Sequence, residues 1–225
     1  MLNVDSSEHP QTESPPRVMV YVDGFNLYHG VLRDNPQWKW LNLERLFDAL
    51  RPHEKVIGIR YFTAILDEAK PVSERRDRQK RYLKALESLS RVRIIKGKFQ
   101  SREVTCRASC RQTYSVPEEK KTDVNLALEM VGDAMRGAME RIVLVSGDSD
   151  LEPAIQWVRT NYPAIKVAVY IPQLPGEAKN RRNDSYMRMG AEVKALPLET
   201  FSHHQMPREV QILNGRKVIR PESWA

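Results

Sequence analysis

Four aspartates in this chain lie where carboxylates can bind a metal ion. Asp148 and Asp150 directly follow the apolar run Ile142–Val145, Asp23 ends the first apolar run, and Asp123 opens the strongest helical pattern. Mg²⁺ and Mn²⁺ take oxygen ligands and keep several waters, so about one to three carboxylates suffice when substrate phosphate also binds. These aspartates are our candidate metal ligands and catalytic residues.

Such a site can deprotonate a bound water, orient it towards a phosphorus atom and neutralise charge on the leaving oxygen. Simpler roles stay open for each acid. Asp148 or Asp150 would cap the following helix, Asp123 would favour a helix dipole, and Asp23 before Gly24 would form an ordinary turn. Two acids flanking one serine repel each other without a cation, which favours metal binding.

Polar and basic residues near these acids are candidates for substrate contact. The loop from Pro172 to Asp184 follows a predicted strand, which puts its cations on the same edge as the acids. Asn26 follows Asp23 closely, so it is either a turn or cap residue or a hydrogen-bond donor to Asp23 or a phosphate. The predicted substrate-binding residues are Asn26, Ser146, Ser149, Lys179, Arg181 and Arg182.

Apolar periodicity predicts six strands that would position these residues. They are Val18–Val22, Val56–Ala64, Val92–Phe99, Ile142–Ser146, Lys166–Ile171 and Val193–Leu198. Helical patterns lie between most of them, which predicts an α/β fold with a mainly parallel sheet covered on both faces. Open α/β sheets bind ligands at the carboxyl ends of their strands, so the acids are expected to converge there.

Four helices have apolar stripes that predict their buried faces. The clearest stripe is spaced by four, three, four and four residues, as a core-facing helix requires, and consists of Val124, Leu128, Val131, Met135 and Met139. Two others consist of Leu43, Leu46, Phe47 and Leu50, and of Tyr82, Leu83, Leu86 and Leu89. The fourth helix is expected to begin at Asp150 or Leu151 and to carry Ile155, Trp157 and Val158.

The remaining segments set the domain boundaries. We predict a disordered tail at 1–16, one domain at 17–201 and an extension at 202–225, in which Val210–Leu213 could form a short edge strand. A polar excursion at about 101–121 interrupts the alternation and could cover the site. Its cysteines, Cys106 and Cys110, are expected to be reduced thiols; a regulatory disulfide or half of a shared zinc site stays open.

Composition favours an anionic partner. The chain has 225 residues, 41% of them hydrophobic, and 36 Lys and Arg against 29 Asp and Glu give a net charge of +7. No apolar run approaches the roughly 18 residues that a membrane helix needs, and the polar start from Met1 to Arg17 lacks a signal-peptide core. We therefore expect a soluble cytoplasmic protein that binds no membrane; a homo-oligomer stays open.

Three runs resemble the blocks of the NYN-domain nucleases, which are relatives of PIN domains. They are Val20–Leu27 (VYVDGFNL), Lys120–Glu129 (KKTDVNLALE) and Val145–Asp150 (VSGDSD). The resemblance covers about Arg17 to Leu198 and implies a Rossmann-like, PIN-like three-layer α/β/α fold with a Mg²⁺- or Mn²⁺-dependent ribonuclease site. By position it implies Asp23, Asp123, Asp148 and Asp150 as metal-binding residues, with Asn26 beside them.

The chain departs from the family pattern at three positions. The family often has Gly where Lys121 stands, Phe where Leu151 stands and Asp where Glu129 stands. None of these departures removes a principal acid.

The leading hypothesis is a metal-dependent endoribonuclease that binds single-stranded or structured RNA. Its affinity would come from cations, namely Arg75, Arg76, Arg78, Lys80, Arg81, Lys179, Arg181 and Arg182, although the first five could equally form a solvated helix face. Tyr28, Trp38 and Trp40 could stack unpaired bases, but aromatics near a helix start more often belong to the core.

Two other function classes compete with the nuclease. A non-catalytic module that binds RNA or protein on the same fold is disfavoured, because it has little reason to keep like charges together. A phosphatase with an Asp-x-Asp pair normally carries that pair on its first strand, whereas here it follows the fourth predicted strand. No Gly-x-Ser-x-Gly elbow, Walker A or dinucleotide fingerprint is present.

Overall fold

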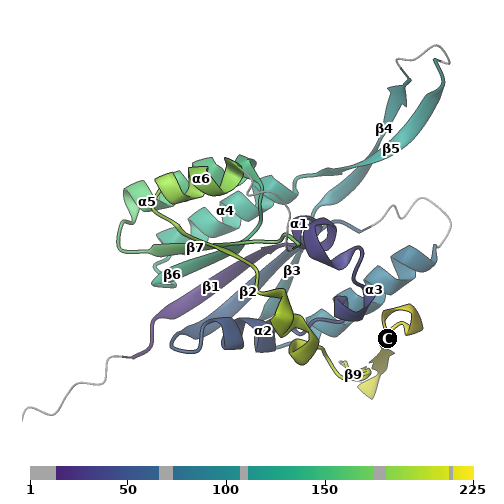
Figure 1. Ribbon diagram of the computed structural model, residues 1–225, viewed down its shortest axis with the longest axis horizontal. Helices are drawn as coiled ribbons and strands as arrows, with labels where there is room; N and C mark the ends of the chain where they lie inside the picture. The colour runs from purple at the N-terminus through teal and green to yellow at the C-terminus, as the bar shows by residue number, and fades with distance from the viewer. Residues whose placement is uncertain (1–13, 66–72, 107–110, 175–180, 213–214) are drawn as a thin grey trace, which may run out of the picture.

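A computed structural model describes residues 14–65, 73–106, 111–174, 181–212 and 215–225 (Figure 1). Six parallel strands form one sheet in the order β3-β2-β1-β6-β7-β8. The strands are β1 (Arg17–Asp23), β2 (Lys55–Thr63), β3 (Val92–Lys96), β6 (Arg141–Val145), β7 (Lys166–Ile171) and β8 (Glu192–Ala195). The predicted mainly parallel sheet is confirmed, although the last strand ends before Leu198.

Helices cover both faces of this sheet, which gives three layers (Figure 1). One face packs against α4 (Thr122–Met135), α5 (Glu152–Asn161) and α6 (Arg181–Arg188). The other packs against α2 (Leu43–Leu50) and α3 (Glu74–Glu87). The predicted buried stripes of α2 and α3 are confirmed at Leu43, Leu46 and Phe47 and at Tyr82, Leu83 and Leu86.

The strand order reverses between β1 and β6. The chain goes from β1 outwards to β3 on one side and then returns to fill β6, β7 and β8 on the other. Crossovers on opposite sides of two neighbouring parallel strands leave a crevice at their carboxyl ends. That crevice lies directly beyond Asp23 of β1 and Val145 of β6.

The predicted buried face of α4 is wrong at Val124, Leu128 and Met135, although Val131 is partly buried and Met139, beyond the end of the helix, is buried. Val124, Leu128 and Met135 are 62%, 65% and 61% exposed, whereas Leu126 and Met130 are fully buried. Both stripes are apolar, so hydrophobicity alone does not choose between them.

Polar contacts with the sheet fix the rotation of α4. Asp133 accepts hydrogen bonds from Tyr21 of β1 at 2.9 Å and from Arg60 of β2 at 3.2 and 3.3 Å. Glu129 forms ion pairs with Arg60 and Arg93. These partners lie on the sheet, so the helix side that carries Glu129 and Asp133 must face inwards.

The predicted polar excursion at about 101–121 is a two-stranded arm. It consists of β4 (Lys98–Thr105) and β5 (Thr113–Lys120), paired antiparallel, and it extends away from the body (Figure 1). The predicted strand Val92–Phe99 is therefore interrupted at Gly97, between β3 and β4. Cys106 follows β4 as a free thiol, and Cys110 lies outside the described residues.

The C-terminal segment packs onto the α2 and α3 side of the sheet. It holds β9 (Glu209–Gln211) and β10 (Lys217–Ile219), an antiparallel pair separate from the main sheet, so Val210 lies in a strand but not at the edge of that sheet. Val210, Val218 and Trp224 join the core on this face, and the Trp224 ring lies 6.3 Å from that of Trp40. No helix in the described part of the chain is long and apolar enough to span a bilayer.

Candidate active site

Asp23 is the most buried acid of the crevice, at 2% exposure, and its carboxylate accepts four hydrogen bonds. One oxygen caps the helix α1 (Gly24–Leu27) by accepting from the backbone N–H groups of Phe25 and Asn26, at 3.0 and 2.9 Å. The other accepts from Asn26 Nδ2 at 2.7 Å and from Ser146 Oγ at 2.9 Å. Burial nevertheless raises the pKa of Asp23 above its ordinary value.

Asn26 and Ser146 tie the ends of β1 and β6 together. Asn26 Oδ1 accepts from the Gly147 N–H at 3.2 Å while its amide donates to Asp23. Ser146 Oγ donates to Asp23 and accepts from the Asp148 N–H at 3.1 Å. Their hydrogen bonds show that both residues position the acids, whereas their predicted contact with substrate stays a prediction.

Asp148 and Asp150 lie at the turn from β6 into the 3₁₀ turn η3 (Ser149–Leu151). Asp148 Oδ1 accepts from the Asp150 N–H at 3.1 Å, so Asp148 does act as a helix cap. The Tyr186 hydroxyl of α6 donates to the Asp148 carbonyl, which fixes the same turn from outside. Asp150 and Ser149 are exposed at the mouth of the crevice.

The fourth acid, Asp123, stands across the crevice on the first turn of α4. Burial and then the negative charges of Asp23, Asp148 and Asp150 raise the pKa of Asp123 to about 6. Each of these charges acts on Asp123, so the structure brings the four predicted acids into one electrostatic cluster. A divalent cation would relieve this mutual repulsion.

The acids suit a partly hydrated cation better than a closed metal cage. Within the described ranges, no three His, Cys, Asp or Glu side chains group closely enough to hold an ion. Mg²⁺ usually keeps several waters and binds through one or two carboxylates together with substrate phosphate. Asp123, Asp148 and Asp150 are the acids available to supply one or two such bonds, because every oxygen of Asp23 already accepts two hydrogen bonds.

The structure describes only some of the basic residues that were predicted to contact substrate. Lys179 lies outside the described residues, and Arg181 and Arg182 begin α6, the helix whose Tyr186 contacts Asp148. On α3, Arg78 pairs with Glu74 at 3.1 Å and Arg81 with Asp77 at 2.8 Å, as on a solvated helix face.

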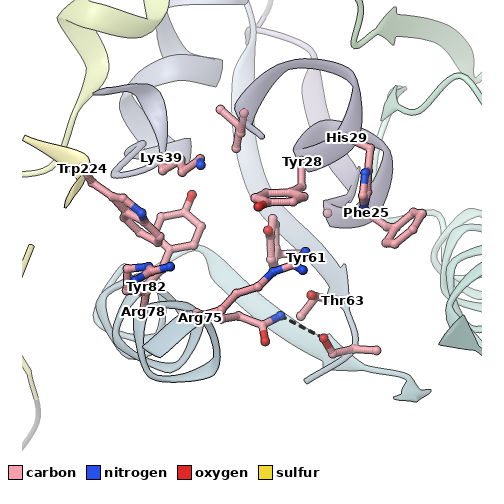
Figure 2. Close-up of a pocket in the computed structure, with 14 residues that line it drawn as sticks. Phe25, Tyr28, His29, Lys39, Tyr61, Thr63, Arg75, Arg78, Tyr82 and Trp224 are labelled. Carbon is pink, nitrogen blue, oxygen red and sulfur yellow. Dashed lines mark hydrogen bonds between the residues drawn. The ribbon is translucent and has the colours of Figure 1, made fainter. Parts of the chain in front are cut away.

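A second hollow lies beside the acids, and the sequence pattern does not reveal it. It is a cavity of about 140 Å³ at the carboxyl end of β2, reached from Gly24, the residue after Asp23 (Figure 2). Five aromatic rings line it, those of Phe25, Tyr28, Tyr61, Tyr82 and Trp224, together with the cations Lys39, Arg75 and Arg78. Of the proposed stacking residues only Tyr28 lines it, and Trp40 is fully buried.

A close backbone approach joins the cavity to the acidic crevice. A Cβ on Gly24 would stand 2.6 Å from the Phe62 carbonyl oxygen and 2.8 Å from the Tyr61 ring, so glycine is required there. The next turn, η1 (Tyr28–Leu32), is π-helical, a local form frequent at functional sites. This turn carries Tyr28 and His29, which both line the cavity, and Figure 2 shows His29 beside Phe25, whose ring lies 4.2 Å away.

Comparison with known proteins identifies relatives of this chain. The family model "NYN domain" matches residues 17–188. A curated protein named 6-hydroxy-3-succinoylpyridine 3-monooxygenase HspA, from Pseudomonas putida (strain DSM 28022 / S16), is 30% identical over 93% of this chain and 76% of its own length.

A solved structure shares the fold. A protein of unknown function from Vibrio parahaemolyticus RIMD 2210633 superposes with a TM-score of 0.52 at 17% identity, over 83% of this chain and 96% of that one. At this identity the likeness concerns the fold alone.

Proposed function

Because the chain belongs to the NYN domain family, we propose that it is a metal-dependent endoribonuclease. The observation that carries this proposal is the convergence of four carboxylates where the strand order reverses, between β1 and β6. The charges of Asp23, Asp148 and Asp150 raise the pKa of the fourth acid, Asp123. Like charges held together in a crevice are costly to folding unless a cation binds there. The proposed substrate is RNA, single-stranded or structured.

In this proposal one or two of Asp123, Asp148 and Asp150 would hold Mg²⁺ or Mn²⁺ at the crevice mouth, with water and substrate phosphate as the other ligands. A bound ion of this kind supplies charge neutralisation and an activated water for hydrolysis of a phosphodiester. Asp23 keeps its hydrogen bonds to Asn26 and Ser146 and so holds the ends of β1 and β6 in register. Ser149, exposed at the same mouth, is suited to contact a phosphate oxygen.

The test is cleavage of an end-labelled, mixed-sequence RNA and its DNA counterpart with Mn²⁺, Mg²⁺ or EDTA. We expect RNA cleavage that needs the metal and that Asp148→Asn abolishes while the variant keeps its thermal transition, because Asp148 is a crevice residue outside the core. Asp48→Asn is the matched control, since Asp48 is an exposed acid of α2 paired with Arg91 at 2.7 Å.

Other outcomes would contradict the nuclease proposal, the role of Asp148 or the choice of RNA as substrate. Binding of RNA without cleavage under every metal condition would replace the nuclease with the non-catalytic binding module. Equal loss of activity in Asp48→Asn, or loss of the thermal transition in Asp148→Asn, would contradict the assigned role of Asp148. Cleavage of DNA alone would reject RNA as the substrate.

Two observations favour a second candidate, oxygenation of a small heteroaromatic compound. The relative from Pseudomonas putida is named as a monooxygenase of 6-hydroxy-3-succinoylpyridine, and an aromatic cavity lies beside the acids of this chain. Oxygen uptake with that compound and a nicotinamide reductant, lost in Tyr28→Leu, would support this candidate. Uptake no faster than without protein would reject it.

A further inference from the structure

The cavity beside the acids has a size that selects among planar ligands. Its volume is about 140 Å³. An apolar cavity of roughly 150 Å³ holds one benzene molecule, so a single six-membered ring fills the volume of this cavity and a fused two-ring system exceeds it. The cavity is open on one side, so a substituent on such a ring can extend out of it.

The aromatic side chains that line the cavity are arranged to contact a planar ligand ring. Tyr61 and Tyr82 meet edge to face at 6.2 Å, and Tyr82 meets Trp224 in the same manner at 6.2 Å. The Tyr82 hydroxyl is turned away to donate to the Leu41 carbonyl at 3.1 Å, which leaves ring surface along the wall. Aromatic edges and faces arranged at such angles favour contact with a further planar ring.

Positive charge gathers at the opening. Lys39 Nζ and the Arg75 guanidinium lie 5.5 and 5.7 Å from the centre of the Tyr28 ring, and Arg78, which pairs with Glu74 at 3.1 Å, also lines the cavity. No acid is among the described residues that line the cavity. Burial lowers the pKa of Lys39, and the nearby charges of Arg78 and Arg75 lower it further, against an opposing effect of Asp34.

We propose that this cavity binds one six-membered planar ring that carries an anionic group, with the ring between the aromatic walls and the anion at Lys39 and Arg75. Figure 2 shows both cations reaching towards Tyr28 from different elements, Lys39 from the loop before α2 and Arg75 from α3. An anion placed there would neutralise charges that otherwise repel one another.

Two sources can supply this chemistry. One is a pyrimidine nucleotide of an RNA strand, an identification that rests on the proposed nuclease function and would make the cavity a base pocket next to the acids. The other is a free monocyclic aromatic acid. Both share a single ring and an anion, and neither a purine nor an uncharged nucleoside does.

The test is an NMR titration in EDTA that follows the indole N–H of Trp224, assigned with Trp224→Phe. The probes are uridine 5′-monophosphate, adenosine 5′-monophosphate, uridine and 4-hydroxybenzoate. We expect uridine 5′-monophosphate or 4-hydroxybenzoate, or both, to bind at least about tenfold more tightly than the adenine nucleotide and uridine. Preference for the nucleotide assigns the pocket to RNA, and preference for the benzoate assigns it to a free acid.

Two variants locate the binding. Arg75→Gln is expected to weaken the favoured probe by about tenfold, because it removes one charge at the opening. Arg81→Gln is the matched control on the same helix, and its guanidinium is paired with Asp77. Tyr28→Leu, which keeps most of the side-chain volume, is expected to weaken the probe as well.

The proposal is overturned if neither anionic probe shifts the Trp224 signal. Equal binding of the adenine nucleotide or of uridine, or unchanged binding in Arg75→Gln, would overturn it too. Because the titration contains no divalent metal and involves no turnover, its result is independent of whether the protein cleaves RNA. Failure of the cleavage test therefore leaves this measurement intact.

Discussion

Asp123 is an acid whose ionised form destabilises the fold. Its pKa is raised from 3.8 to about 6 by burial and by the other three acids. The folded state therefore holds the proton more tightly than the unfolded state between these two values, so stability falls as pH rises through this window. Below the window the carboxyl is protonated in both states and no penalty remains.

We expect Asp123→Asn to unfold at a higher urea concentration than the unmodified protein at pH 7.5 in EDTA. The expected gain is about 1 kcal/mol, since the side chain is partly exposed and solvent screens its interactions. At pH 3.5 the gain should vanish. Adding Mg²⁺ should stabilise the unmodified protein more than the variant, and equal stability of both at pH 7.5 would contradict the prediction.

Lys121 adopts a backbone conformation that favours glycine. Its φ is +75°, in the left-handed region, immediately before α4. This is a position at which the family pattern often has Gly, so the departure in sequence coincides with a local strain. A left-handed non-glycine residue costs about 1–2 kcal/mol, and glycine loses about 0.5–1 kcal/mol more backbone entropy on folding.

Lys121→Gly is therefore expected to raise the free energy of unfolding by about 0.5–1 kcal/mol. Lys121→Ala is the control, because it removes the same charge and keeps the Cβ that makes this conformation costly. Denaturant unfolding of both variants measures the difference. An alanine variant as stable as the glycine variant would assign the effect to charge and not to backbone strain.

The sequence was sufficient to locate the acids but not to separate their roles. Asp23 ends an apolar strand and Asp148 closely follows another, and parallel strands share a carboxyl edge, so the pattern places both acids at one edge of the sheet without making them neighbours. The four hydrogen bonds that saturate Asp23 come from Phe25, Asn26 and Ser146, and they depend on how the turn after β1 closes. Strand periodicity carries no information about that closure.

At the level of elements, α4 shows where periodicity is insufficient. It has two apolar stripes, and in the more regularly spaced one Val124, Leu128 and Met135 are exposed. The buried stripe includes Asp133, which a hydrophobicity pattern excludes from a core. Although burial alone would raise the pKa of Asp133, hydrogen bonds from Arg136, Arg60 and Tyr21 hold it below its ordinary value.

Two leucines two positions apart test this rotation of α4. Leu126 is fully buried and Leu128 is 65% exposed. We expect Leu126→Ala to lower the free energy of unfolding by about 2–5 kcal/mol through the cavity that it leaves. Leu128→Ala should change it by less than about 0.5 kcal/mol. The reverse order in urea unfolding would restore the face that the sequence pattern predicts.

Gly97 explains why the predicted third strand is split. Its N–H donates to the Thr63 carbonyl at 2.8 Å, and a Cβ there would stand 2.4 Å from Thr122 Oγ1. The chain passes so close to the start of α4 that only glycine fits. At this point it leaves the sheet and enters the arm, so an apolar run that reads as one strand becomes two.

For the whole molecule, alternation of strands and helices predicts the layers but not the strand order. The order determines that β1 and β6 are neighbours and hence that Asp23 and Asp148 share a crevice. It also places the cations of α3 beside the same edge, next to the aromatic cavity. The chain has a net charge of +7 and an acidic crevice. The fold places this negative crevice next to a positive region, the cations that line the aromatic cavity.

The arm of β4 and β5 is separable from this architecture. It extends away from the body, and its strands pair with each other from Lys98↔Lys120 to Thr105↔Thr113 (Figure 1). Because Lys98 and Lys120 are opposite partners, a two-residue Gly-Gly turn can join them. We expect replacement of 99–119 by Gly-Gly to leave the free energy of unfolding within about 0.5 kcal/mol of the unmodified protein.

Urea unfolding measures this difference, and the Mg²⁺-dependent gain in stability provides a second readout on the same variant. The site lies between β1, β6 and α4, whose contacts do not pass through the arm, so the metal response should persist. A large loss of stability would mean that the arm supports the start of α4, where Lys120 leads into the strained Lys121. Loss of the metal response alone would assign the arm to holding Asp123 in place.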